Sequence, residues 1–407
     1  MWLSEASSAQ KRALLAASLG WMLDSMDILL YSMVLAFMMR DLGMSEGTAG
    51  LMASLTLAAS AAGGIVFGVL ADRRGRARAL MISILCYSVF TAACGLAQNT
   101  LQLAVFRVLL GLGMGGEWAC GAALVAETWP AKHRGKALGV MQSSWAVGYG
   151  LAAALTALIL PRFGWRSVFF AGIVPALIVF WIRRCVPEPD IWLKSRRLSA
   201  ARSFRPQLGD LWRGEHRRRF IVATVANAGT MFAWWGLFTW IPAYLSLPPD
   251  RGGAGLSVVK TSTWIILMQV GMWLGYVSFG YISDRIGRKL SYAGYIFIAA
   301  ALVPVYGGTR DPAWLLLVGP LVGFFGTGYF SGFGAITAEM FPTAFRASAQ
   351  GLTYNLGRGV SALAPFLVGM LGSRHGLGSA FLLTSASFVL AGVVALFLPE
   401  TRGRELE

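Results

Sequence analysis

Apolar stretches of about 20 residues fill most of this chain, and they decide what it can fold into. The hydrocarbon core of a bilayer is about 30 Å thick and is crossed by roughly 20 residues of α-helix. Hydrophobic residues make up 56% of the 407 and charged residues only 13%, which is typical of a membrane protein. The sequence predicts an all-α membrane protein with twelve transmembrane helices, at residues 13–39, 48–71, 79–98, 101–126, 137–160, 167–184, 219–246, 261–283, 290–308, 313–338, 348–371 and 378–398.

The basic residues are distributed unevenly between the predicted loops. If both termini are inside, 26 of the 35 Lys and Arg residues lie in inside loops and tails and 7 in outside loops. This asymmetry predicts cytoplasmic termini and a multi-pass protein of the inner (plasma) membrane. The net charge of +16 is then explained by topology and by contact with anionic lipid, so no nucleic-acid partner is expected. No cleavable signal is expected either, because the first apolar segment is longer than a signal peptide.

Three motifs recur at the same offset of 212 residues. "GVLADRRGR" at 68–76 returns as "GYISDRIGR" at 280–288, and "ETWPAKHRGKALG" at 127–139 as "EMFPTAFRASAQG" at 339–351. "PEPD" at 187 and "PETR" at 399 form the third pair. A single offset predicts two pseudo-symmetric six-helix bundles, residues 1–186 and 217–407, joined by a basic cytoplasmic linker at 187–216.

The motifs and the repeat resemble the major facilitator superfamily over essentially the whole chain. "RVLLGLGMGGEW" is similar to an Arg-plus-glycine pattern of that family, and "PEPDIWL" and "PETRG" resemble its sugar-porter branch. "LDSMD", an arginine and a glutamate near 107–117 and an arginine near 358 look like the organic-acid:proton symporters for aromatic acids or for sialate, lactate and pyruvate. The resemblance implies a monomer that transports by rocking its two halves.

No catalytic pattern accompanies this resemblance. The three histidines lie in predicted loops, no nucleophile–base pairing or phosphate-binding glycine loop is seen, and the four cysteines lack metal-ligand spacing. We therefore expect a protein that is not an enzyme and that needs no cofactor.

The repeated motifs are expected to form a cytoplasmic gate. Gly68 and Gly75 suit a sharp turn, and the resemblance implies that Asp72 and Asp284 face the opposite half and latch it. The alternative is that these charges only anchor the topology. The residues expected in the gate are Gly68, Asp72, Arg73, Arg76, Glu127, Arg134, Glu188, Asp284, Arg285, Arg288, Glu339, Arg346 and Glu400.

Few ionisable residues fall inside the predicted helices. Asp24 and Asp27 share one side of the first helix at i, i+3, and such residues are costly at bilayer depth and therefore candidates for function. We expect Asp27 to carry the coupled proton with Asp24 as its neighbour, and the resemblance implies that Arg107 and Glu117 are their partners. The alternative is a fixed ion pair that only aligns helices.

Arg358 stands without an acid at similar depth in the second half, so an anion is expected to bind it. We expect a small organic acid substrate, a monocarboxylate or an aromatic carboxylate, moved together with protons. The alternative is that Arg358 pairs with Asp27 or Glu117. Further expected substrate contacts are Asn355, Tyr354, Asn227, Trp235, Gln142, Trp145, Tyr149 and Gln269.

Three other functions remain open from the sequence. A proton-coupled sugar or polyol porter is favoured by "PETRG", efflux of hydrophobic compounds is less favoured because residues 137–160 lack a Gly-Pro kink, and a non-transporting sensor is disfavoured by the intact repeated motifs.

Overall fold

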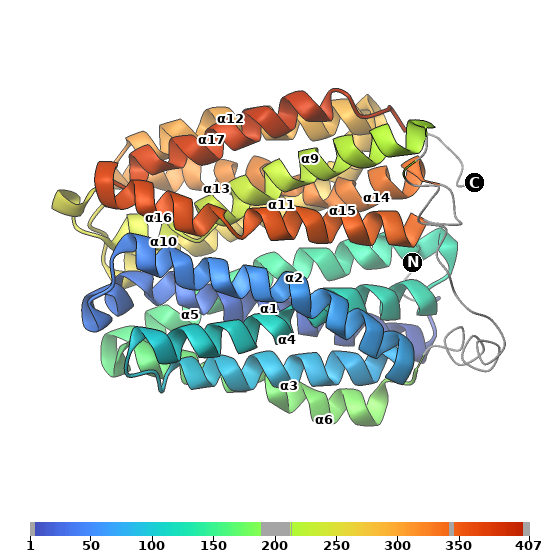
Figure 1. Cartoon of the computed structure of the whole chain (residues 1–407), viewed down its shortest axis with the longest axis horizontal. Coiled ribbons are helices and arrows are strands. Elements are labelled where there is room, and N and C mark those ends of the chain that lie inside the picture. The colour runs from blue at the N-terminus through green and yellow to red at the C-terminus, as the bar shows by residue number, and fades with distance from the viewer. Residues whose placement is uncertain (1–4, 189–211, 213, 342–345, 402–407) are drawn as a thin grey trace. The chain divides into compact units, whose positions relative to one another are not determined.

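The computed structural model describes residues 5–188, 212, 214–341 and 346–401, and every regular element in these ranges is helical. The helices, labelled in Figure 1, are α1 (Ser8–Leu42), α2 (Glu46–Arg74), α3 (Arg76–Cys94), α4 (Thr100–Thr128), α5 (Ala131–Phe170), α6 (Pro175–Cys185), α9 (Gly214–Phe238), α10 (Ile241–Ser246), α11 (Val258–Ile286), α12 (Arg288–Gly308), α13 (Pro312–Gly328), α14 (Phe330–Met340), α15 (Arg346–Ser361), α16 (Ala364–His375) and α17 (Leu377–Ala395), with short 3-10 turns at Ala171–Ile173 and Pro249–Arg251. The predicted all-α class is confirmed for the described ranges. Most of the expected linker, 189–211, lies outside them.

Eleven stretches of the described residues are long and apolar enough to cross a membrane. One of them, 136–182, has 47 residues and covers two of the helices expected from the sequence. At 1.5 Å per residue it would measure about 70 Å, over twice the thickness of a bilayer core. Gly164 interrupts it with φ 75° and ψ 174°, outside the helical region. Twelve crossings stay a prediction, and this interruption is where the long stretch would turn.

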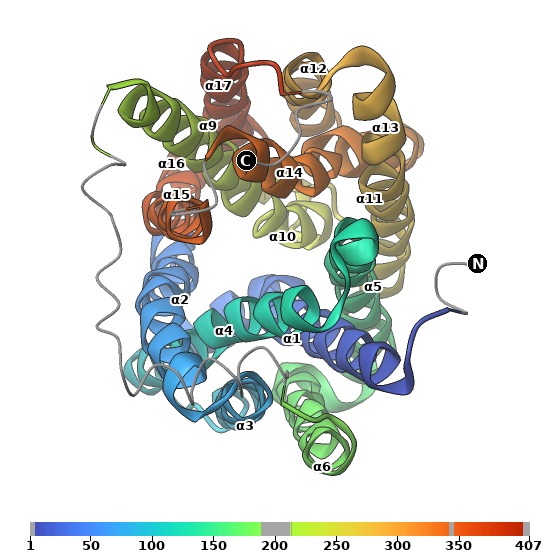
Figure 2. The same ribbon diagram turned by 90° about the vertical axis from the view of Figure 1, so that its right-hand side faces the viewer.

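The helices group into two compact units. Of the described residues, the first contains 5–34 and 55–188, and the second contains 35–54 and those from 212 onward. The division therefore falls between 188 and 212, at the expected linker, whereas the end of α1 and the start of α2 group with the second unit. Within the first unit α3 and α4 run side by side, and within the second unit α12 and α17 do so (Figure 2).

Close approach of α1 and α5 in the first unit depends on a glycine. A Cβ placed on Gly148 would lie 1.8 Å from the carbonyl oxygen of Met22 and 2.9 Å from Cβ of Ser25. The hydroxyl of Ser25 donates to the carbonyl of Trp145 at 2.8 Å, and the rings of Trp21 and Trp145 lie 4.5 Å apart between centroids. These contacts fix the helix that carries Asp24 and Asp27.

Two helix breaks in the second unit lie beside Pro242 and Pro365, and at the second of them side chains bond backbone groups. The sequence predicts a break at Pro242, and α9 ends at Phe238 just before it. A second break separates α15 from α16, where the indole of Trp240 donates to the carbonyl of Pro365 at 2.9 Å. The amide of Phe366, in the first turn of α16, donates to Ser54 Oγ of α2 at 3.2 Å.

Candidate functional site

The two aspartates of α1 lie inside the first unit, away from solvent. Asp24 and Asp27 are each 1% exposed, and they share one side of the helix because they are three residues apart. Charged groups at such positions are expensive unless they have partners or serve a function. The surroundings of each carboxyl therefore matter for what it can do.

Glu117 of α4 reaches the same region from another helix. It is fully buried, and a Cβ placed on Gly20 would lie 2.3 Å from its Oε1, so the absence of a side chain on α1 makes room for this carboxyl. The hydroxyl of Tyr87, on α3, donates to the carbonyl of Gly20 at 3.3 Å. Tyr87 is close enough to Asp24, Asp27 and Glu117 for each of these acids to affect it electrostatically.

The carboxyl of Asp27 lies beside Thr91 and Gly172 in the interior of the first unit. Neither of its oxygens has a hydrogen-bond partner among the described residues. A Cβ on Gly172, in the 3-10 turn Ala171–Ile173, would lie 3.2 Å from Asp27 Oδ1 and 2.2 Å from the methyl of Thr91. Gly172 and Thr91 thus form the wall beside this carboxyl. A charged carboxylate held there without partners costs several kcal/mol, and the neutral acid costs much less.

Arg107 packs its guanidinium over an aromatic ring. Its guanidinium carbon lies 4.1 Å from the centroid of Tyr31, one helical turn beyond Asp27, and the side chain is 1% exposed. Its Nε and Nη1 have no hydrogen-bond partner in the described part of the chain, where no ion pair of Arg107 is found. A cation over an aromatic face is stabilised by about 2 kcal/mol when desolvated. The partnership of Arg107 with the acids stays a prediction.

The expected contacts on α5 lie close to α1 and α4. The indole of Trp118 donates to Oε1 of Gln142 at 3.3 Å. Trp145 packs on Trp21 as described above, and Tyr149 is fully buried. Trp145 and Tyr149 therefore lie in the interior of the first unit, and Gln142 is half-buried.

Arg358 of α15 is 3% exposed in the second unit. No hydrogen bond or ion pair of its side chain is found among the described residues. Asn227 of α9 lies beside Gly357, the residue before Arg358. A Cβ placed on Gly357 would lie 2.3 Å from Nδ2 of Asn227. That Nδ2 donates to the carbonyl of Thr353 at 3.1 Å, which leaves Oδ1 buried and without a partner in the described ranges.

The other residues expected to contact substrate occupy three helices of the second unit. The amide of Asn355 donates to the carbonyl of Gly351 at 3.0 Å, and Tyr354 is half-buried on the same helix. Trp235 is buried on α9, with its ring 4.8 Å from that of Trp234. Gln269, on α11, is 4% exposed, and neither atom of its amide has a partner in the described residues.

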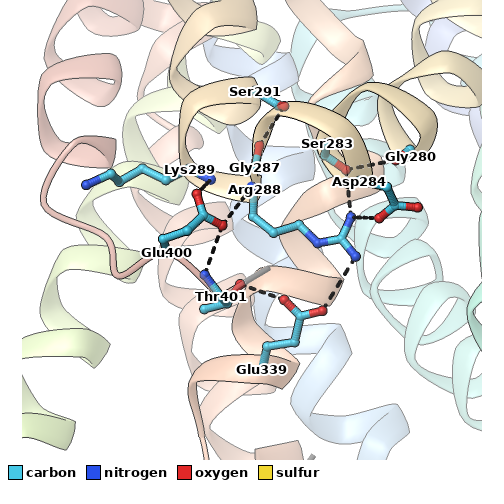
Figure 3. Close-up of polar contacts among 10 residues, drawn as sticks. All are labelled: Gly280, Ser283, Asp284, Gly287, Arg288, Lys289, Ser291, Glu339, Glu400 and Thr401. Atoms are coloured by element: carbon cyan, nitrogen blue, oxygen red, sulfur yellow. Dashed lines mark hydrogen bonds and ion pairs between the residues drawn. The ribbon is translucent and has the colours of Figure 1, made fainter. Parts of the chain in front are cut away.

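Figure 3 shows the repeated motifs of the second unit as one polar network centred on Arg288. Its Nη1 lies 2.7 Å from Asp284 Oδ1 and donates to Ser283 Oγ at 2.7 Å, and its Nη2 lies 3.6 Å from Glu339 Oε1. Glu400 accepts the first amides of α12, from Arg288 at 2.9 Å and from Lys289 at 3.2 Å. A carboxylate at a helix N-terminus satisfies free amides and the positive end of the helix dipole.

The first unit contains a similar arrangement 212 residues earlier, with its glutamate cap shifted by one residue along the helix. Arg76 Nη2 lies 2.9 Å from Glu127 Oε1, and Glu188 accepts the amides of Ala77 and Arg78 at the start of α3, both at 3.1 Å. Gly75 and Gly287 precede the two capped helices with φ of 109° and 105°, a region that favours glycine.

The other gate residues are placed less fully. Gly68 lies inside α2, well before its end at Arg74, so the turn is made by Gly75 and not by Gly68. Arg285 lies in the last turn of α11. The side chains of Asp72, Arg73, Arg134 and Arg346 lie outside the described residues.

A helical bundle with eleven membrane-length apolar stretches, buried ionisable groups and a repeated polar network defines a membrane transporter. The model of the Major Facilitator Superfamily matches residues 15–249 and 251–407, so the chain belongs to this family. It is therefore a multi-pass membrane protein of a transporter family and not an enzyme.

Relatives named as transporters match over nearly the full length. A putative metabolite transport protein of Haemophilus influenzae is 35% identical over 97% of this chain and 98% of its own. A probable 4-methylmuconolactone transporter of Cupriavidus pinatubonensis is 34% identical, covering 100% and 94%. A cis,cis-muconate transport protein of Acinetobacter baylyi is 32% identical, covering 97% and 95%. The xylose transporter XylE from E. coli has a similar structure, with a TM-score of 0.78 over 98% of this chain and 100% of that one, and at 19% identity this shows the fold alone.

Proposed function

We propose that this protein imports a small organic acid anion, a monocarboxylate or an aromatic carboxylate, together with protons. Relatives at 30–34% identity are named for 4-methylmuconolactone, cis,cis-muconate, niacin and sialic acid, which favours an organic acid here. The single observation that carries the proposal is Arg358, a nearly buried guanidinium without an ion pair among the described residues.

A buried guanidinium calls for an anion, and its planar fork matches a carboxylate in bidentate fashion. The substrate carboxylate supplies that anion. Asn227 Oδ1, held beside Gly357, is a free acceptor near the same turn of α15, so a donor group on the substrate can bind there. Asn355, Tyr354, Trp235 and Gln269 are the further proposed substrate contacts in the second unit, and Gln142, Trp145 and Tyr149 are those in the first.

The proton binds at Asp27. Its two oxygens have no hydrogen-bond partner among the described residues, which makes the ionised form costly in the closed interior. The protein therefore changes conformation with Asp27 protonated, and the carboxyl releases its proton when the site is open. Asp24, Glu117 and Arg107 set the local charge around it, with Arg107 able to leave Tyr31 when the carboxylate is ionised.

Transport proceeds by alternating access of two six-helix bundles, residues 1–186 and 217–407, joined by the linker 187–216. Twelve crossings with both termini in the cytoplasm place the repeated networks on the cytoplasmic side of an inner membrane. There the Arg76–Glu127 and Arg288–Glu339 pairs, with Asp72, Asp284, Arg134 and Arg346, form a gate that opens and closes. The transporter works as a monomer.

The test is uptake of a carboxylate panel into proteoliposomes with and without an inward proton gradient. Arg358→Ala should reduce uptake of the accepted acid by roughly thirtyfold or more, because truncating a buried charge partner costs 2–5 kcal/mol. Arg358→Lys should recover part of it, since a lysine keeps the charge but not the bidentate geometry.

The matched control is Arg374→Ala, which removes an exposed arginine from α16 of the same unit and should leave uptake unchanged. Uptake that survives Arg358→Ala, or that ignores the proton gradient, contradicts the proposal. Competition by glucose or a polyol in the same assay would instead support the sugar-porter alternative.

A further inference from the structure

We propose that the start of α9 is a binding site for one anionic phospholipid. A pocket of about 280 Å³ lies there, lined by Gly214, Arg217, Arg218, Ile221 and Val222. Figure 2 shows this end of α9 at the outer edge of its unit, beside α17. The residues begin one of the apolar stretches that can cross a membrane, 214–246, so the pocket lies where a helix enters the bilayer.

The three consecutive arginines of this segment have different roles. Arg219 is engaged within the protein, because its Nη2 pairs with Glu215 Oε1 at 2.7 Å and its Nη1 donates to the carbonyl of Met340 at 3.3 Å. Arg217 and Arg218 are exposed, and no ion pair of either is found among the described residues. The acid nearest in sequence, Glu215, is already paired with Arg219. Within the described ranges, the two positive charges are therefore available to an external anion.

Helical spacing puts an apolar side chain directly beyond each of these cations. Ile221 follows Arg217 and Val222 follows Arg218 at i+4, which is the same face one turn further along. Ile221 is 43% exposed, and Val225, the next i+4 position, is 41% exposed. The pocket thus offers two guanidinium groups at its rim and an apolar stripe leading toward the membrane interior.

An aromatic residue marks the same level. The ring of Trp212 is 57% exposed and packs edge-on against Phe220 at 5.6 Å between centroids. Tryptophans concentrate at headgroup depth because one part of the ring is apolar and the N–H prefers water. A phosphate above acyl chains matches this order of cation, aromatic ring and aliphatic stripe, and the cytoplasmic leaflet supplies anionic lipid.

The experiment is native mass spectrometry of the purified full-length protein titrated with phosphatidylglycerol or with zwitterionic phosphatidylethanolamine. We expect one phosphatidylglycerol to bind more tightly than phosphatidylethanolamine. The double variant Arg217→Ala/Arg218→Ala should weaken the affinity for phosphatidylglycerol about thirtyfold, because each arginine near a membrane surface contributes about 1 kcal/mol. Ile221→Ser/Val222→Ser should weaken it as well, and inorganic phosphate alone should not displace the lipid.

A charge-matched control is Arg310→Ala/Arg374→Ala, which removes two exposed arginines elsewhere in the same unit. Equal binding of both lipids, full binding by the Arg217/Arg218 double variant, an equal loss in the control, or displacement by inorganic phosphate would each overturn the proposal. Thermal unfolding in detergent verifies that every variant is folded. The readout is lipid binding, so it does not depend on the identity of the transported substrate.

Discussion

Replacing Gly148 by alanine should displace the helix that carries the two buried aspartates. The added Cβ would lie 1.8 Å from the carbonyl oxygen of Met22, whereas Cβ contacts essentially never fall below 3.0 Å. The obstacle is backbone of α1 and not the end of a flexible side chain, so α1 and α5 must separate by about 1.2 Å there. Asp24 and Asp27 follow Met22 on α1 and move with it.

Overpacking of this kind costs about 1–3 kcal/mol. For a unit of 150–250 residues each kcal/mol lowers the melting temperature by about 2–4 °C, so Tm should fall by roughly 2–12 °C. The rate of proton-driven uptake should also fall, by up to about a hundredfold, because a displacement of about 1 Å can reduce a rate that much where groups must be positioned. Both quantities can be measured on one preparation, by thermal unfolding in detergent and by uptake after reconstitution.

The control on the same helix is Gly139→Ala, where an added Cβ meets nothing within 4 Å. It should be neutral or slightly stabilising, because alanine is favoured over glycine in a helix by up to about 1 kcal/mol. If Gly148→Ala unfolds at the temperature of Gly139→Ala and transports at its rate, the close approach of α1 and α5 does not position the aspartates, and the reasoning fails.

Three further predictions concern single side chains. Asp27→Asn should abolish accumulation driven by a proton gradient yet keep counterflow of the accepted acid, whereas Asp24→Asn should only reduce accumulation; the opposite pattern would exchange their roles. Glu400→Ala should lower Tm in detergent by the equivalent of about 1 kcal/mol, since two amides of α12 lose their acceptor, with Glu400→Gln intermediate; an unchanged Tm would show that the cap does not stabilise. Tyr31→Leu should lower Tm more than Tyr31→Phe because only phenylalanine keeps a ring under Arg107, and equal losses would argue against the cation–π contact.

Most helix positions could be predicted from the sequence because apolar length is a strong signal in a membrane protein. The break before Pro242 was also predictable, since proline removes an amide that the helix needs. The break between α15 and α16 was not predicted, because the sequence was read as one helix over 348–371. Pro365 lies in the first turn of α16, a position where proline is common in helices. The repeated offset identified Arg76 with Arg288, Glu127 with Glu339, and Glu188 with Glu400. The two arginine–glutamate pairs match, and both glutamates cap a helix start, with the cap of Glu188 one residue further along.

The surroundings of the buried acids were harder to predict. The sequence identified Asp24, Asp27 and Glu117 by their charge in an apolar run, but it gave no role to Tyr87, Thr91 or Gly172, which approach from other segments. Such contacts depend on which helices pack against each other, and a single sequence does not show this. Tyr31 had a usable signal, because it lies seven residues after Asp24 and four after Asp27 and so shares their helix face.

The two glutamate caps have an implication for how the chain arose. Glu188, the last described residue of the first unit, caps α3 of that unit, and Glu400, close to the last described residue of the second, caps α12 of the second. Neither half borrows this closing residue from the other. A gene encoding one half would therefore have specified a self-sufficient end to its own helices, so that an ancestral dimer of identical chains could become a single chain by duplication and fusion without rebuilding this corner.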